Sequence, residues 1–398
     1  MSRQSANLGT EDIGRRLRPF GVVVALATLA LVAAACVPPQ PATGPSPSDA
    51  PRAGDAAYSD HGPFGVGVTT VELSDRQMEV WYPVDPGDIG DAPGDSYRIR
   101  DFVSSYLDGL IDPAVDPVYQ TDAARDVPAS AEGPFPLVLF AHGFASFRQQ
   151  SSFLTTHLAS WGFVVISPDF LDRGLKAVLG EPPAVSRSDK SVVDEAINTT
   201  RALTTADAGL LSGVVDASRV FPVGHSAGGG TAVQMLDRSD VPSAIPLASG
   251  YFLAAASAGR LDIPLDKPVM WIGAQNDHIA SIDDIRLGFQ MTAGQRKLIE
   301  LRDSGHLNAF SDICDIGDGG IVAIARAASL PIPEFLLQLG NDGCPVPLNR
   351  PSHEIWPEVR HFVTAELRYR SGIDAQPVGL GDQVLARFDD VATYKHNP

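Results

Sequence analysis

The sequence has 398 residues, of which 44% are apolar and 20% charged, and it can bury one large core without requiring two domains. Its net charge of −18 at pH 7 disfavours nucleic acid as a partner, because an acidic surface repels phosphates. A soluble surface is the simpler interpretation of this charge.

The N-terminal residues have the composition of an export signal. Arginines fall within residues 1–18, residues 21–35 are almost wholly apolar, and three alanines precede Cys36. This pattern predicts a signal peptide over residues 1–35, and the apolar run is short for a membrane span. Cys36 and the proline-rich tract after it resemble the lipobox of bacterial lipoproteins. We therefore expect a lipidated Cys36 on an exported protein held at the cell membrane, with simple secretion as the alternative.

Composition divides the remainder into a tether, a domain and a tail. Residues 36–57 are rich in Pro, Ser, Ala and Gly and too poor in apolar side chains to fold. Residues 58–372 read as one folded domain. The tail, residues 373–398, contains one amphipathic piece at 384–391, which either packs on the domain or lies loose.

The domain reads as strands alternating with helices, which predicts an α/β fold with a mostly parallel sheet and helices on both faces. A hairpin is expected around Ser74, and residues 85–134 read as a long loop with one short helix near 102–110. The other expected strands are 137–141, 163–167, 220–223, 244–247, 269–273 and 297–301. The other expected helices are 150–161, 190–211, the helix after Ser226, 282–291 and 354–369.

Residues 224–228 spell Gly-His-Ser-Ala-Gly between an apolar strand and a helix. Glycine at both flanking positions leaves room for a sharp turn that raises the Ser226 hydroxyl, so this context predicts a nucleophile elbow. Pro222 cannot donate to a central strand ladder, which suggests a bulge or a late strand end there.

A serine nucleophile needs a histidine base, and the histidine needs an acid that fixes its tautomer. Asp277 follows the strand at 269–273, and His306 follows the strand at 297–301. The order Ser226, Asp277, His306 is the chain order of an α/β-hydrolase triad. Alternatives remain for two members. The candidates are His225 and His278 as the base and Asp283, Asp284 and Asp303 as the acid.

An oxyanion requires backbone donors that already point at it. The N–H of Ala227, at the helix start, is one expected donor, and the N–H of Phe144 after the strand at 137–141 is the other. Gly143 permits the chain to turn there, and His142 is expected to be structural. We expect Phe144, Tyr251 and Phe252 to lie near an apolar substrate pocket.

Taken together, these motifs resemble bacterial serine esterases of the α/β-hydrolase superfamily, close to the group of platelet-activating-factor acetylhydrolases, chlorophyllases and cutinase-like polyester hydrolases. The resemblance covers roughly residues 62–310 and is carried by segments 62–66, 80–83, 142–144, 224–230, 273–277 and 305–306. It implies hydrolysis of a small-molecule ester through an acyl-enzyme, without a metal or an organic cofactor. A monomer is expected.

Two departures separate this chain from the polyester hydrolases. Those enzymes usually carry a tryptophan after the strand that follows the elbow helix, whereas residues 247–252 read LASGYF, which weakens a polymer substrate. They also run almost directly from the histidine into the last helix, whereas residues 310–350 intervene here and are expected to cover the acyl side of the cleft.

The insertion, residues 310–350, carries two cysteines and an apolar stretch that predicts a helix over 321–339. In an exported domain Cys314 and Cys344 are expected to pair, which would stabilise the fold by roughly 3 kcal/mol. Asp312, Asp315 and Asp318 are not spaced as a calcium loop, so a solvated acidic face is the expected interpretation.

Three functions are compatible with these residues. The first is a serine carboxylic ester hydrolase, and the second is a peptidase or acyltransferase with the same triad. The third is a cell-surface binding protein on an inactive hydrolase scaffold, against which the intact serine, acid and histidine argue.

Overall fold

The computed structural model describes residues 55–115, 117–251 and 265–397. The predicted signal peptide, Cys36, almost all of the predicted tether and Phe252 lie outside these residues. Among the described helices, none combines the length and apolar character that a membrane span requires.

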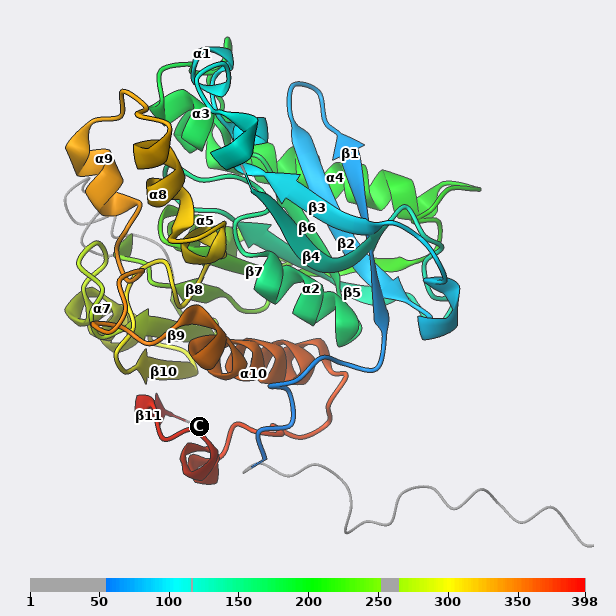
Figure 1. Cartoon of the computed structure of the whole chain (residues 1–398). Coiled ribbons are helices and arrows are strands. Elements are labelled where there is room, and N and C mark those ends of the chain that lie inside the picture. Colours follow the sequence, from blue (N-terminus) through cyan, green and yellow to red (C-terminus); the bar gives the residue numbers. More distant parts are fainter. Residues whose placement is uncertain (1–54, 116, 252–264, 398) are drawn as a thin grey trace, which may run out of the picture. The chain divides into compact units, whose positions relative to one another are not determined.

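The described strands form one eleven-stranded sheet in the order β11-β10-β9-β8-β7-β5-β6-β2-β1-β4-β3 (Figure 1). The six strands from β10 to β6 in that order run parallel to one another. Strands β2 and β11 pair antiparallel at the two ends of this parallel block. The strands are β1 (Gly65–Glu72), β2 (Gln77–Val84), β3 (Gly94–Arg98), β4 (Val118–Arg125), β5 (Phe135–Ala141), β6 (Val164–Pro168), β7 (Val215–His225), β8 (Ile245–Leu247), β9 (Val269–Ala274), β10 (Arg296–Leu301) and β11 (Val391–His396).

Helices cover both faces of the sheet, because the parallel strands are apolar on both sides. Helices α2 and α10 pack on one face, and α4, α5 and α7 pack on the other. The described helices are α1 (Ser105–Asp108), α2 (Ser152–Ser160), α3 (Leu175–Val178), α4 (Asp189–Thr205), α5 (Ala227–Gln234), α7 (Ile282–Met291), α8 (Gly320–Ala327), α9 (Glu334–Leu339) and α10 (Ser352–Ser371). This arrangement confirms the predicted α/β-hydrolase fold class.

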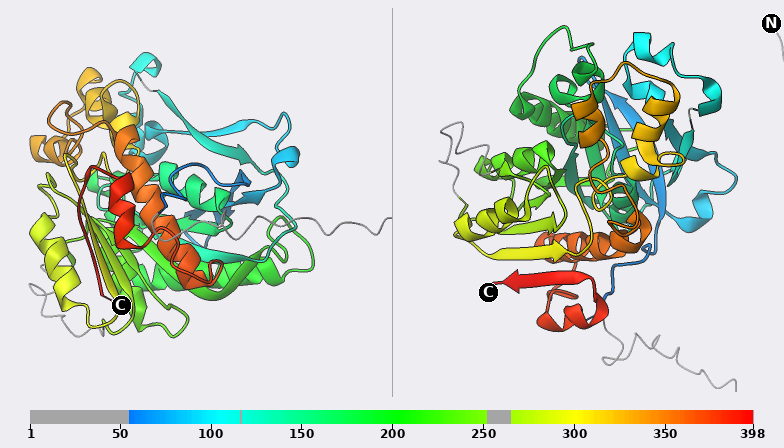
Figure 2. Two further views of the ribbon diagram at one scale, coloured as in Figure 1. Left: turned by 90° about the horizontal axis from the view of Figure 1, so that it is seen from below. Right: turned by 60° about the vertical axis from the view of Figure 1, so that its left-hand side comes forward.

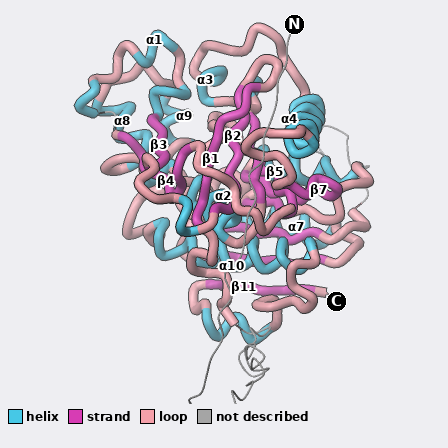
Figure 3. Tube along the Cα trace, turned by 90° about the vertical axis from the view of Figure 1, so that its right-hand side faces the viewer, coloured by secondary structure: helices cyan, strands magenta, loops and turns pink. Residues whose placement is uncertain are grey.

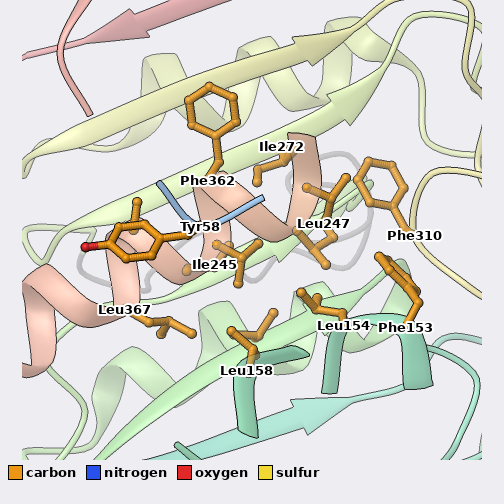
Figure 4. Packing of buried hydrophobic residues seen from close by; sticks show 14 of the residues in the cluster. Tyr58, Phe153, Leu154, Leu158, Ile245, Leu247, Ile272, Phe310, Phe362 and Leu367 are labelled. Atoms are coloured by element: carbon orange, nitrogen blue, oxygen red, sulfur yellow. The ribbon is translucent and has the colours of Figure 1, made fainter. Parts of the chain in front are cut away.

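Alternate residues of each strand divide between two cores. Along β5, for example, Val138 and Phe140 belong to the core beneath α2 and α10, whereas Leu137 and Leu139 belong to the opposite core. Figure 4 shows the first core, where α2 and α10 side chains meet those of β8 and β9. Its labelled members include Leu154, Leu158, Ile245, Leu247, Ile272, Phe362 and Leu367.

The segment predicted as a loop over residues 85–134 contains two strands, so that prediction was wrong. Strands β3 and β4 pair antiparallel at one end of the sheet (Figure 3). Their polar composition reads as loop, but Arg125 forms ion pairs with the buried carboxylates of Asp95 and Glu79, at 2.6 and 2.7 Å. These charges are satisfied by residues distant in sequence, which a local pattern does not reveal.

Two other elements differ from their prediction, and the tail adopts one of its two predicted arrangements. Helix α4 ends at Thr205 instead of Leu211, since the chain becomes extended at Ala206. Pro222 lies within β7, opposite Leu139 of β5, and the register shift in this pairing falls before Val220 instead. The tail packs on the domain, because β11 pairs with β10 (Figure 2) and the buried Tyr394 hydroxyl donates to the Leu380 carbonyl.

Candidate active site

The turn between β7 and α5 has the geometry of a nucleophile elbow. Ser226 adopts φ 57° and ψ −120°, a conformation that L residues rarely adopt, and α5 begins at the next residue. A Cβ atom at Gly224 would lie 2.1 Å from the Gly228 carbonyl oxygen, and one at Gly228 would lie 1.9 Å from the Ala141 carbonyl oxygen. Both positions therefore require glycine, as the sequence pattern predicted.

Asp277 and His306 form a buried hydrogen-bonded pair. The Nδ1–H of His306 donates to Asp277 Oδ2 at 2.7 Å, and the other carboxylate oxygen accepts from the backbone N–H groups of Ile279 and Ala280 at 2.8 and 2.7 Å. The two side chains are 4% and 0% exposed. The three donors hold the carboxylate in place, and the carboxylate in turn orients the imidazole with Nδ1 toward Asp277.

Ser226 and His306 border the same pocket, at the carboxyl ends of β7 and β10. The Ser226 hydroxyl forms no hydrogen bond to any other described residue. Nucleophile and base often remain apart until substrate binds, so this geometry is compatible with a resting site. Of the residues that the structure describes, Asp277 is the one whose carboxylate bonds to the His306 ring.

Ala227 and Phe144 carry the two backbone N–H groups that were predicted as oxyanion donors. Ala227 is the first residue of α5, where N–H groups have no partner within the helix. A Cβ at Gly143 would lie 3.2 Å from Ser226 Cβ, so the loop that carries Phe144 lies against Ser226. Neither the Phe144 nor the Ala227 N–H bonds to a described residue, so both donors are available.

A side-chain bridge joins this loop to the backbone of His306, and sequence analysis did not find it. Gln150 Oε1 accepts from the Gly143 N–H at 2.9 Å, and Gln150 Nε2 donates to His225 Nδ1 at 2.9 Å. His225 Nε2 in turn donates to the His306 carbonyl at 3.0 Å. Burial lowers the pKa of His225 well below its usual value, and nearby His306 lowers it further, so His225 remains neutral.

His225 therefore does not occupy the position of the base, and His278 does not occupy it either. The His278 side chain is 82% exposed and bonds to Asp342. His142 is structural, as expected: its ring lies between the Gly143 carbonyl and the Phe170 N–H, and burial lowers its pKa to about 3.

The alternative acids also lie elsewhere. Asp283 pairs with Arg286, Asp284 accepts from the Ser281 hydroxyl, and Asp303 is exposed.

Two pockets meet at Ser226, and the predicted substrate residues divide between them. Phe144 borders an apolar pocket of about 130 Å³ that also contains His306. Tyr251 borders a more polar pocket of about 500 Å³ instead, so its placement near the apolar pocket was wrong. Tyr251 borders this second pocket together with Ala227, and His306 is not part of its lining. Phe252 lies outside the described residues.

The insertion after His306 forms one wall of the apolar pocket. Cys314 and Cys344, near the two ends of the insertion, form the predicted disulfide. The expected single helix over 321–339 was wrong, because Pro331 and Pro333 separate α8 from α9.

The expected solvated acidic face was wrong for Asp312. This carboxylate is buried and accepts hydrogen bonds from Ser152 and Phe153 at the start of α2. Asp315 and Asp318 are exposed, and within the described ranges no group of three or more His, Cys, Asp or Glu side chains is arranged to hold a metal ion.

The sheet order, the elbow and the buried Asp–His pair define an α/β-hydrolase. A family model described as PET hydrolase-like matches residues 124–327, just over half of the chain. The chain therefore belongs to the PET hydrolase-like family.

Individual relatives match at low identity. Platelet-activating factor acetylhydrolase of Cavia porcellus is 23% identical over 297 residues, which cover 62% of this chain and 67% of that protein. Bis(hydroxyethyl) terephthalate hydrolase of Streptomyces coelicolor is 24% identical over 235 residues, 54% of this chain and 68% of that protein. Cutinase est2 of Thermobifida alba is 30% identical over 146 residues, 36% of this chain, and the match spans only 43% of the cutinase.

Proposed function

We propose that the protein is a serine-dependent carboxylic ester hydrolase that acts through an acyl-enzyme. The observation that carries this proposal is the buried Asp277–His306 hydrogen bond of 2.7 Å. His306 borders the same pocket as Ser226, which lies on a turn with the geometry of a nucleophile elbow. The named activities of the relatives support ester hydrolysis as the reaction class.

In the proposed reaction, Ser226 Oγ attacks the ester carbonyl carbon while His306 Nε2 accepts the hydroxyl proton. Asp277 stabilises the resulting imidazolium and holds its orientation through Nδ1. The negative charge that develops on the carbonyl oxygen is stabilised by the N–H groups of Phe144 and Ala227, and the α5 dipole adds to this effect.

The same imidazolium then returns the proton to the leaving alkoxide, which departs as an alcohol and leaves the acyl group on Ser226. A water molecule, deprotonated by His306, attacks the acyl-enzyme, and the collapse of that intermediate returns the proton to Ser226. The carboxylic acid product is released as the carboxylate at neutral pH. Every proton moves between the serine, the histidine, the substrate and water.

A Ser226→Ala variant tests this mechanism, with Ser218→Ala as its control. Ser218 is an exposed serine of the same strand, β7, far along the strand from the elbow. We expect Ser226→Ala to lower kcat for p-nitrophenyl acetate by at least about 10³-fold, while Ser218→Ala retains the wild-type value. Wild-type rates in the Ser226 variant would exclude the mechanism.

The same assay distinguishes the related reactions. Faster turnover of an amide analogue, or acyl transfer to an added alcohol in preference to water, would indicate a peptidase or an acyltransferase.

We also propose that the protein is exported, which the Cys314–Cys344 disulfide supports because disulfides persist in oxidising compartments. Recovery of the protein in the cytoplasmic fraction would contradict export.

A further inference from the structure

The apolar pocket begins at Ser226 and His306 and is walled by segments distant in sequence. Val103 comes from the segment before α1, Leu175 from α3, and Val322 from α8 in the insertion. Helices α1, α3, α8 and α9 lie together on one side of the sheet in Figures 1 and 2. The pocket is therefore a product of the insertion as well as of the hydrolase core.

The lining excludes a charged ligand. Of the described residues that border the pocket, none is Asp, Glu, Lys or Arg, and Phe144 is the only one with a phenyl or indole ring. The remaining surface is largely aliphatic. Gln150 and His225 also border the pocket, but their polar atoms bond to each other, to the Gly143 N–H and to the His306 carbonyl. The Ser146 hydroxyl is the one buried polar group of the lining without a hydrogen-bond partner among the described residues. Such a surface favours a chain without polar groups over a terephthalate unit with its second ester, since burying an unpaired polar group there would be costly.

The insertion is anchored directly to the catalytic loop. Asp342 Oδ1 accepts from the His306 N–H at 2.9 Å, and the Asp342 carbonyl accepts from the Leu307 N–H at 3.0 Å. At the other end of the insertion, Asp312 Oδ2 accepts from the Ser152 N–H at 2.7 Å. These bonds hold the pocket wall in a fixed position relative to the histidine, so a chain bound in the pocket would also position the ester bond.

We propose that this pocket binds a linear aliphatic chain, which makes uncharged aliphatic monoesters, and not aromatic polyesters, the preferred substrates. The inference rests on the ester hydrolase function proposed above. The two pockets meet at Ser226 and Ile279, so the ester bond lies at their junction and the other half of the substrate extends toward Tyr251. The aliphatic chain is either the acyl group or the alcohol, and the two arms of the test separate them.

The size of the pocket sets the length of the chain. Its volume is about 130 Å³. An apolar cavity of about 150 Å³ in another protein binds benzene, which has six carbons, so a chain of about six carbons should fill this pocket. Each methylene that moves from water into the pocket improves binding by about fourfold. From a two-carbon to a six-carbon chain, which adds four methylenes, kcat/KM should therefore rise by up to about 250-fold.

The test measures kcat/KM of the purified full-length protein on two ester series. One series varies the acyl chain of p-nitrophenyl esters from acetate to octanoate, and the other varies the alcohol of acetate esters from methyl to octyl. The filling variant is Ala325→Phe, because Ala325 is buried on α8 and borders the pocket. The matched control is Ala327→Phe, an exposed alanine of the same helix outside the pocket lining.

We expect one series to rise toward six carbons in the wild type and in Ala327→Phe, and to become flat in Ala325→Phe. A Leu337→Ala variant, which enlarges the same wall, should move the optimum to longer chains, and it tests the inference even if Ala325→Phe does not fold. A rise confined to the acyl series assigns the chain to the acyl group, and one confined to the alcohol series assigns it to the alcohol.

The inference would be overturned if kcat/KM did not change with chain length in either series, or if Ala325→Phe and Ala327→Phe had the same dependence on chain length. Labelling with a small fluorophosphonate separates this failure from failure of the proposed function. A labelled Ser226 with flat profiles overturns only the aliphatic pocket, whereas an unlabelled, inactive protein overturns the ester hydrolase as well.

Discussion

Replacing Asp277 with asparagine should stop catalysis while leaving the fold in place. Asp277 Oδ1 accepts two backbone N–H groups, from Ile279 and Ala280, at 2.8 and 2.7 Å. An asparagine must keep its oxygen at this position, because its NH₂ group would meet two donors there. The NH₂ group then faces His306 Nδ1, which becomes the acceptor and moves the imidazole proton to Nε2.

The tautomer with the proton on Nε2 cannot accept the proton of Ser226. The same change in a Ser-His-Asp protease lowers kcat by about 10⁴, and we expect a loss of this order here. It corresponds to about 5.5 kcal/mol of transition-state stabilisation. The charge-assisted bond to His306 is replaced by a neutral one, so the free energy of unfolding should fall by no more than about 3 kcal/mol.

The assay is the steady-state hydrolysis of p-nitrophenyl acetate, with urea unfolding measured on the same preparation. Asp283→Asn is the matched control, because Asp283 is 82% exposed and pairs with Arg286 on α7. We expect wild-type kcat in this control. If Asp277→Asn retained kcat within tenfold of the wild type, or Asp283→Asn lost it, the assignment of the acid would be refuted.

Three further predictions concern residues around the triad and the packing of the domain. Gln150→Leu removes the bridge between Gly143 and His225, so kcat should fall about tenfold or more with KM nearly unchanged. Replacing Cys314 and Cys344 with serine should lower the free energy of unfolding by about 3 kcal/mol, as measured in urea. Burial lowers the pKa of His361 to about 4, so this histidine takes up a proton more readily in the unfolded state. The free energy of unfolding of the wild type should therefore fall by up to about 3 kcal/mol as pH falls from about 6.5 to 4, and His361→Gln should remove this contribution.

Each of these predictions has a control that separates it from a general loss of structure. For Gln150→Leu, an increase in KM with unchanged kcat would show that Gln150 does not position the catalytic groups. A reducing agent should destabilise the wild type but not the double serine variant, and equal effects would contradict the role of the disulfide. His353 is exposed on the same helix, α10, so a His353→Gln variant should keep the pH dependence of the wild type.

The central sheet and the residues of the candidate site could be predicted because their signals are local. The strands of the parallel block contain short apolar runs, and Ser226, Asp277 and His306 each come a few residues after one of these runs. The glycines at 224 and 228 are required by contacts within a few residues of the elbow and with the neighbouring strand. Local patterns of this kind survive in a single sequence.

The features that were not predicted depend on distant partners. Strands β3 and β4 carry charges that are neutralised across the sheet, as the ion pair between Arg125 and Asp95 shows. The bridge from Gln150 to His225 links positions 75 residues apart, and nothing local marks either side chain as part of it. The division of the insertion into α8 and α9 is different, because Pro331 and Pro333 are visible in the sequence and predict the break.

The most direct test of the proposed mechanism is to locate the residue that a serine-hydrolase probe modifies covalently. The purified protein is treated with a fluorophosphonate and digested, and the modified peptide is identified by mass spectrometry. We expect one adduct, on Ser226, that is absent from the Ser226→Ala variant and strongly reduced in His306→Ala. An adduct on another residue, or undiminished ester hydrolysis by protein in which Ser226 is fully modified, would contradict the proposed mechanism.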